Sequence, residues 1–125
     1  MFNWVGVYLL KGDVLELGPY LGAATEHTRI NVGVGVCGTA VARNADMNVP
    51  DVAASDNYLA CSVETRSELV VLIRDRRGAI VGQVDIDSHT PRAFGPREEQ
   101  LVRDVAAELG VRWADAVSSM ETPAR

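Results

Sequence analysis

Two cysteines, Cys37 and Cys61, are the strongest candidates for chemistry in the sequence. Cys37 follows a glycine-rich stretch and precedes the expected start of a helix, where backbone N–H groups favour a thiolate. Cys61 lies in a polar segment, and Arg66 offers a positive charge nearby. Small buried hydrophobic residues are the common alternative for free cysteines. The two thiols are therefore structural, metal-bound or redox-active.

Two carboxylates, Asp85 and Asp87, stand two positions apart in an otherwise apolar segment. If this segment is a strand, both side chains project from one face, and their proximity raises the pKa of at least one carboxyl group. An ionised group and a proton donor would then share one site. A solvated face near the end of a strand is the alternative, but the apolar neighbours favour a pocket.

Trp4 and Tyr8 share a face of the first expected strand, and Gly6 between them leaves space. Ordinary core packing explains such an aromatic pair. The alternative is an aromatic wall for a small ligand that carries a cation or a thioether.

A zinc site is the remaining chemical possibility, since His27 and His89 supply ligand types that suit zinc together with the two cysteines. The spacings match no compact zinc motif, so we expect no metal. The sequence also lacks a P-loop, GxGxxG, GxSxG and HExxH.

Alternating apolar runs define the elements that must position these residues. Strands are expected at 3–10 and 14–20 around Lys11-Gly12-Asp13, at 47–49, and at 69–74 and 79–88 around a turn that ends at Gly78. A short helix is expected over 39–44. In the last strand, one face should carry Ile80, Gly82, Val84 and Ile86, and the other Gln83, Asp85 and Asp87.

A long helix is expected from Pro96, with Arg97-Glu98-Glu99 in its first turn. Its apolar stripe consists of Leu101, Val105, Leu109 and Trp113, widened by Val102 and Ala106. Strand pairs with a short and a long helix predict an α+β fold with a mostly antiparallel sheet.

The composition fits one soluble globular domain of 125 residues, with 47% hydrophobic residues and a net charge of −5. We expect the domain over 1–117 and a flexible tail over 118–125. The acidic balance and the lack of basic runs argue against nucleic-acid and membrane binding. No export signal is evident, so a cytoplasmic location is expected.

Six short motifs occur in the order and rough spacing of one family. They are Asn3-Trp4-Val5-Gly6-Val7-Tyr8, Leu17-Gly18-Pro19-Tyr20, Gly35-Val36-Cys37-Gly38-Thr39-Ala40, Leu59-Ala60-Cys61, Ser67-Glu68-Leu69-Val70 and Asp85-Ile86-Asp87-Ser88. Over about residues 3 to 110 the chain resembles the GAF-domain free methionine-(R)-sulfoxide reductases.

This resemblance implies a six-stranded antiparallel sheet flanked by helices, commonly in a homodimer. It also implies reduction of free L-methionine (R)-S-oxide, with thioredoxin or another thiol as reductant and no other cofactor. Cys61 matches the family's nucleophile, and Cys37 matches its second cysteine. The substrate pocket would be lined by Trp4, Tyr8, Glu68, Asp85 and Asp87.

The chain departs from the family pattern in two places. Family members usually carry a further, resolving cysteine just before Arg29-Ile30, and here His27 lies closest to that position. Resolution would then fall to Cys37 or to an external thiol. The N-terminal helices of the family are also missing from this sequence.

The resemblance suggests a mechanism. A Cys61 thiolate attacks the sulfoxide sulfur while Asp85 or Asp87 protonates the oxygen, and Cys37 condenses with the resulting sulfenic acid. Glu68 and one ionised aspartate would hold the substrate ammonium. The alternative is a non-catalytic GAF sensor or binding module, in which the same acidic pocket binds an amine-bearing, amino-acid-like metabolite.

Overall fold

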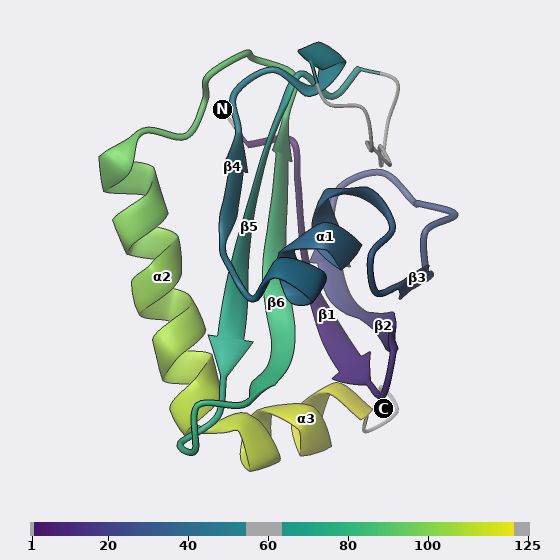
Figure 1. The fold of residues 1–125 in the computed structure, drawn as a ribbon, viewed down its shortest axis with the longest axis vertical. Helices are drawn as coiled ribbons and strands as arrows, with labels where there is room; N and C mark the ends of the chain where they lie inside the picture. The colour runs from purple at the N-terminus through teal and green to yellow at the C-terminus, as the bar shows by residue number, and fades with distance from the viewer. Residues whose placement is uncertain (1, 55–63, 122–125) are drawn as a thin grey trace.

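The fold is a single antiparallel sheet with helices on both faces, seen in a computed structural model that describes residues 2–54 and 64–121 (Figure 1). Within these residues, six strands lie in the order β3-β2-β1-β6-β5-β4. The strands are β1 (Trp4–Lys11), β2 (Val14–Leu21), β3 (Arg29–Asn31), β4 (Met47–Val49), β5 (Ser67–Arg74) and β6 (Ile80–Ser88). The helices are α1 (Gly35–Arg43), α2 (Pro96–Val111) and α3 (Trp113–Glu121), with a 3₁₀ turn at Val52–Ala54. The predicted α+β class is confirmed.

The two predicted hairpins are present, and both turns use glycine in the left-handed backbone region. Gly12 has φ of 62° between β1 and β2, and Gly78 has φ of 84° between β5 and β6. The Asp75 carboxylate accepts hydrogen bonds from the backbone N–H groups of Arg77 and Ala79 in the second turn. Strand β3 was not predicted, because three residues with polar ends give no alternation signal.

Each face of the sheet carries its own hydrophobic core. Helix α1 lies over one face, in front of the sheet in Figure 1, and α2 runs along the other. The α1 core contains Trp4, Tyr8, Leu15, Ile30, Val36, Cys37, Ala40, Val70 and Leu72. The α2 core contains Leu69, Val71, Ile73, Val84, Ile86, Phe94, Val102 and Ala106.

The predicted alternation of β6 is wrong at its first residue. Ile80 packs against the α1 core, whereas Val84 and Ile86 pack in the α2 core. The register with β5 shifts at this point, since Ile73 pairs with Gly82 but Arg74 pairs with Ile80. The extra residue of this β-bulge reverses which face the preceding side chain occupies.

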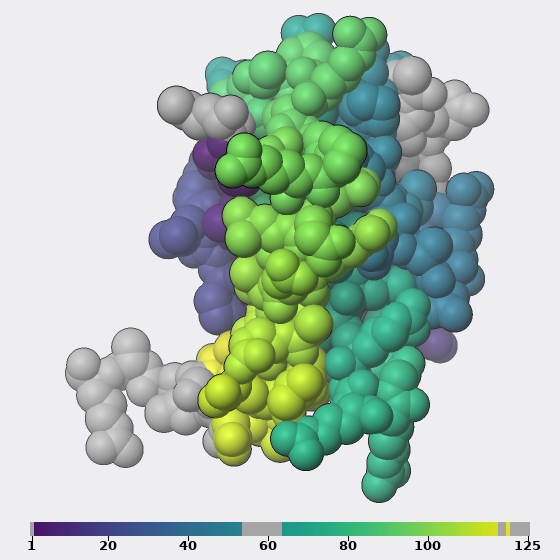
Figure 2. All heavy atoms as spheres, turned by 90° about the vertical axis from the view of Figure 1, so that its left-hand side faces the viewer, coloured from purple at the N-terminus to yellow at the C-terminus, as the bar shows by residue number. Residues whose placement is uncertain are grey.

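The apolar stripe predicted for α2 is also partly wrong. Leu101 and Val105 are 61% and 48% exposed, and the buried positions are Val102, Ala106 and Gly110. A Cβ on Gly110 would lie 1.9 Å from the Arg74 carbonyl oxygen, so the helix rests on β5 through its small residues. Figure 2 looks onto α2, which runs down the middle of that side of the molecule.

The helix ends at Val111, and α3 begins at Trp113, rather than one helix running through both. The predicted domain boundary at residue 117 falls inside α3 and stays a prediction. Among the described residues, no helix is both long and apolar enough to cross a membrane.

Candidate functional site

Three buried carboxyl groups meet on the α1 face of the sheet. Asp87 pairs with Trp4 of β1 on one side and with Glu68 of β5 on the other, and Asp85 pairs with Gly6. Glu68, Asp85 and Asp87 are each only 1% exposed. The prediction that both aspartates share a face and face a buried environment is therefore confirmed, and the solvated alternative is wrong.

Helix α1 brings Cys37 to this acidic cluster. The helix begins at Gly35, four residues before the predicted start, so Cys37 lies in its first turn. The Cys37 thiol donates to Glu68 Oε2 with an S–O distance of 3.7 Å. Gln83 of β6 donates from Nε2 to the Cys37 carbonyl oxygen at 3.0 Å, which ties the helix turn to the sheet.

Burial shifts the pKa values of this cluster upward. Desolvation, with repulsion from Asp85 second, raises the pKa of Glu68 well above its usual range. Desolvation also raises the pKa of Asp85, although hydrogen bonds with Glu68 and Cys37 act in the opposite direction. Burial therefore favours the protonated form of these carboxyl groups, and a protonated carboxyl group in the cluster can donate a proton.

The Cys37 thiol does not behave as predicted. Burial raises its pKa, and the negative field of Asp85 and Glu68 adds to the effect. These influences outweigh the stabilisation of an anion by the helix N-terminus, because the thiol is desolvated among carboxyl groups. Cys37 is therefore a neutral thiol in the described structure, rather than an activated thiolate.

The same cluster is the only group of potential metal ligands among the described residues. One donor atom each from Cys37, Glu68 and Asp85 lie within 4.8 Å of one another, and neither His27 nor His89 belongs to the group. Metal binding requires deprotonated ligands. Burial favours the protonated form of all three, so the arrangement suits a proton donor better than a metal site.

The indole of Trp4 forms an aromatic wall beside the acids. Its ring lies directly over Gly6, where a Cβ would come within 2.3 Å of Trp4 Cη2. Trp4 Nε1 donates to the Ala23 carbonyl oxygen at 3.1 Å, and its ring stacks on Tyr20 with centroids 5.7 Å apart. The space that Gly6 was predicted to leave is thus filled by the indole itself.

Tyr8 lies behind this wall and is fully buried. Its hydroxyl donates to the His27 carbonyl oxygen at 2.8 Å, and its ring centroid is 6.4 Å from that of Trp4. Both aromatic residues belong to the α1 core, so the core-packing interpretation holds for each. A direct role of Tyr8 in ligand binding stays a prediction.

A cavity of about 270 Å³ opens beside Trp4 and reaches the acidic cluster at Asp87. It is lined by Asn3, Trp4, Ala23, Glu64, Thr65, Asp87 and His89. Asn3 holds this side of the cavity in place, because its backbone N–H donates to the Asp87 carbonyl oxygen at 2.9 Å. Its side-chain oxygen accepts the His89 backbone N–H at 2.8 Å.

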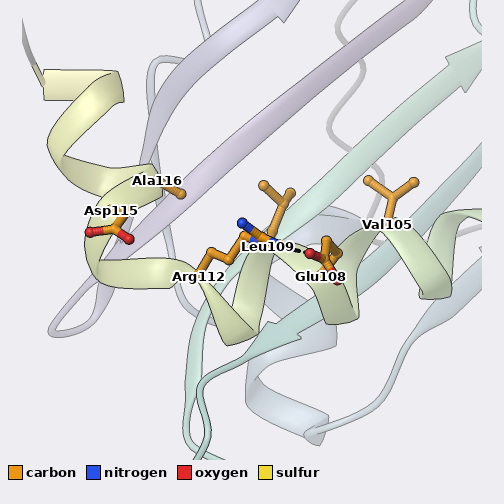
Figure 3. A pocket seen from close by; sticks show the side chains of 6 residues that line it. All are labelled: Val105, Glu108, Leu109, Arg112, Asp115 and Ala116. Atoms are coloured by element: carbon orange, nitrogen blue, oxygen red, sulfur yellow. Dashed lines mark hydrogen bonds and ion pairs between the residues drawn. The ribbon is translucent and has the colours of Figure 1, made fainter.

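Another hollow lies between α2 and α3 (Figure 3), with a volume of about 370 Å³. Its lining residues are Val105, Glu108, Leu109, Arg112, Asp115 and Ala116. Arg112 forms an ion pair with Glu108 across one helical turn. This hollow contains no thiol and none of the buried acids, so the cavity beside Trp4 is the better candidate site.

Cys61 lies outside the described residues, so its predicted place beside the acidic cavity stays a prediction. The described chain resumes at Glu64, which lines the cavity. Sequence reasoning placed Gln83 on the face of the two aspartates but missed its hydrogen bond to Cys37, and it missed the place of Asn3 and His89 in the cavity lining. The only signal for His89 was its place two positions after Asp87.

Comparisons with known proteins agree with this geometry. The GAF domain family matches residues 2–113. A type II free methionine-R-sulfoxide reductase from Thermoplasma acidophilum superposes with a TM-score of 0.85 at 36% identity, over 95% of this chain and 81% of that one. A free methionine-R-sulfoxide reductase from Neisseria meningitidis, solved in complex with its substrate, gives 0.85 at 34% identity, over 94% and 71%.

The chain therefore belongs to the GAF-domain family. Within that family it belongs to the group that includes the free methionine-R-sulfoxide reductases. The Escherichia coli protein of that name is 43% identical over 107 residues, which is 86% of this chain and 64% of the relative. The chain thus spans less than two thirds of the length of this curated relative.

Proposed function

We propose that the protein reduces free L-methionine (R)-S-oxide to methionine with electrons from a thiol. The observation that carries this proposal is the cluster of three buried carboxyl groups beside the Cys37 thiol, one of which, Asp87, lines a cavity walled by Trp4. An acidic site of this kind combines a proton donor with a binding site for a cation.

The acids suit the ammonium group of a free amino acid. Glu68 Oε1 and Asp85 Oδ1 are buried and accept no hydrogen bond from the protein. An ammonium group carries three N–H donors and one positive charge, which would satisfy these oxygens and favour ionised carboxylates. Methionine within a peptide has no such group, so its sulfoxide would leave the buried acids unpaired.

The proposed chemistry begins with a Cys61 thiolate, which attacks the sulfoxide sulfur. A protonated Asp85 or Asp87 delivers a proton to the oxygen, methionine leaves, and Cys61 becomes a sulfenic acid. Cys37 then condenses with the sulfenic acid, so that water leaves and a disulfide forms.

The resemblance also supports thioredoxin as the reductant of that disulfide, assembly into a homodimer, and a cytoplasmic location. In this scheme Cys61, and not Cys37, is the nucleophile that attacks the sulfoxide, so that step does not require an ionised Cys37. The raised pKa of Cys37 would nevertheless slow its attack on the sulfenic acid.

That raised pKa favours one second candidate function, a GAF sensor that binds an amino-acid-like metabolite without turnover. In this case the acidic cavity would hold the ligand's amine, and the buried Cys37 would remain unreactive.

The test is the loss of methionine-(R)-sulfoxide with dithiothreitol and then with thioredoxin. We expect the wild-type protein to turn over with both reductants. The Glu68→Gln variant should bind the substrate about tenfold or more weakly than the wild-type protein. Glu108→Gln is the matched control, because Glu108 is an exposed glutamate on α2. Binding of the sulfoxide without turnover under either condition would replace the reductase by the sensor. Turnover with dithiothreitol alone would remove Cys37 as the resolving thiol.

A further inference from the structure

The ionisable side chains that line the cavity beside Trp4 are acidic, apart from one. Asp87 lies in its wall and Glu64 at its rim, and among the lining residues only the His89 side chain can carry a positive charge. A free amino acid brings a carboxylate as well as an ammonium group into this space. A carboxylate that is left unpaired in a partly buried, acidic site is strongly disfavoured.

His89 is held at a fixed spacing from the acid that faces the cavity. His89 is the first residue after β6, and Ser88, which lies between Asp87 and His89, is the last residue of the strand. The Asp87 and His89 Cα atoms are therefore about 7 Å apart, on the same side of the chain. Asn3 hydrogen-bonds the backbone of both residues, which fixes this pair relative to β1.

The His89 imidazole already binds a carboxylate. Its Nδ1 lies 3.5 Å from Glu64 Oε2, and both residues line the cavity. The two side chains are 41% and 70% exposed, so this contact is weak and a ligand carboxylate can replace Glu64 at little energetic cost. Glu64 thus occupies the place that a ligand carboxylate would take.

We propose that His89 recognises the α-carboxylate of the free amino acid, which displaces Glu64 from the imidazole. The inference rests on the proposed function for the identity of the ligand, and it adds the residue that selects for a free carboxylate. Asp87 and its neighbours bind one end of the zwitterion, and His89 binds the other. Substitutions at the two residues should therefore have opposite effects. Loss of the His89 imidazole weakens binding of the amino acid, and loss of the Glu64 charge strengthens it.

The experiment compares L-methionine with L-methioninamide, which keeps the ammonium group and lacks the carboxylate. Dissociation constants are measured by calorimetry on the full chain, so no turnover is needed. His89→Gln should weaken L-methionine binding about tenfold and change methioninamide binding less than about twofold. Glu64→Gln should tighten L-methionine binding by about two- to threefold.

Two further variants separate charge from structure. His89→Lys should retain most of the preference for methionine over the amide, since it keeps a positive charge at the rim. Arg29→Gln is the matched control, because it removes an exposed cation that pairs with Glu16 on β2 and lies outside the cavity lining. It should leave both dissociation constants unchanged.

Equal binding of methionine and its amide by the wild-type protein and by His89→Gln would overturn the inference, even if the enzyme reduces the sulfoxide. Failure of the wild-type protein to bind either compound would overturn it as well. His89-dependent methionine binding without sulfoxide turnover would support the inference and overturn the proposed function. With turnover, His89→Gln should raise KM for the sulfoxide about tenfold and change kcat less than about twofold.

Discussion

Substitution of Gly6 by alanine tests how tightly the aromatic wall is packed. The added Cβ would lie 2.3 Å from Trp4 Cη2 and 2.7 Å from Cζ3, whereas carbon atoms normally approach to about 3.5–4.0 Å. The indole must therefore move by about 1 Å or more. It has little room to do so, because Gly22 is packed against Trp4 Cδ1, Tyr20 stacks on the ring, and Ala23 accepts its N–H.

Overpacking of this kind destabilises a protein by about 1–3 kcal/mol. Removal of a glycine from a strand returns about 0.5–1 kcal/mol, so Gly6→Ala should reduce the free energy of unfolding by about 1–2 kcal/mol. For a domain of this size, Tm should fall by about 4–8 °C. Circular dichroism during heating measures this shift.

The matched experiment repeats Gly6→Ala in a Trp4→Leu background, in which the clashing ring is absent. There the substitution should be neutral or stabilising, so the coupling free energy should be at least as large as the loss seen in the wild-type protein. An equal loss of stability in both backgrounds would refute the packing of Trp4 over Gly6.

Three further predictions concern the acids, the α1 contact and the α2 contact. Burial raises the pKa of Glu68, so the folded state keeps a proton that the unfolded chain releases above about pH 4.3. The contribution of Glu68 to the free energy of unfolding therefore falls as the pH rises towards the folded pKa. The free energy of unfolding, measured with urea, should therefore fall less between pH 5 and pH 8 in Glu68→Gln than in the wild-type protein. The same pH profile in both proteins would contradict the raised pKa of Glu68. Gln83→Leu removes the side-chain hydrogen bond to the Cys37 carbonyl oxygen that ties α1 to the sheet and should destabilise the fold by about 0.5–1.5 kcal/mol, and unchanged urea unfolding would show that this bond contributes nothing. Gly110→Ala places a Cβ 1.9 Å from the Arg74 carbonyl oxygen and should lower Tm despite alanine's higher helix propensity, whereas a higher Tm would disprove the close approach of α2 to β5.

Local patterns predicted those parts of the fold in which neighbouring residues decide the outcome. The apolar runs located five of the six strands in the described residues, and the side-chain period of two correctly placed Asp85 and Asp87 on one face. The sheet face predicted for Ile80 was wrong, because the β-bulge that reverses it depends on the pairing with β5. The apolar stripe predicted for α2 was partly wrong, because Gly110 lets the helix approach β5 closely. Hydrophobic periodicity carries no signal for such an approach.

The electrostatics of the site were the least accessible to sequence reasoning. Cys37 and Glu68 are far apart in the chain, and their contact forms only when α1 packs on the sheet. The burial that comes with this packing, followed by the negative charges of Asp85 and Glu68, raises the pKa of a thiol that its place at a helix start predicted to be acidic. His89 was named only as a possible zinc ligand, although its position after Asp87 places it at the rim of the same cavity.

The central claim is that the acidic cavity presents free methionine-(R)-sulfoxide to a redox-active cysteine. A single turnover of the reduced protein without external reductant tests it most directly, with methionine quantified and the intact protein mass measured. The account predicts about one methionine per chain from the (R) sulfoxide, none from the (S) form, and a mass loss of about 2 Da as Cys37 and Cys61 form a disulfide. No methionine and an unchanged mass with the (R) sulfoxide would contradict it.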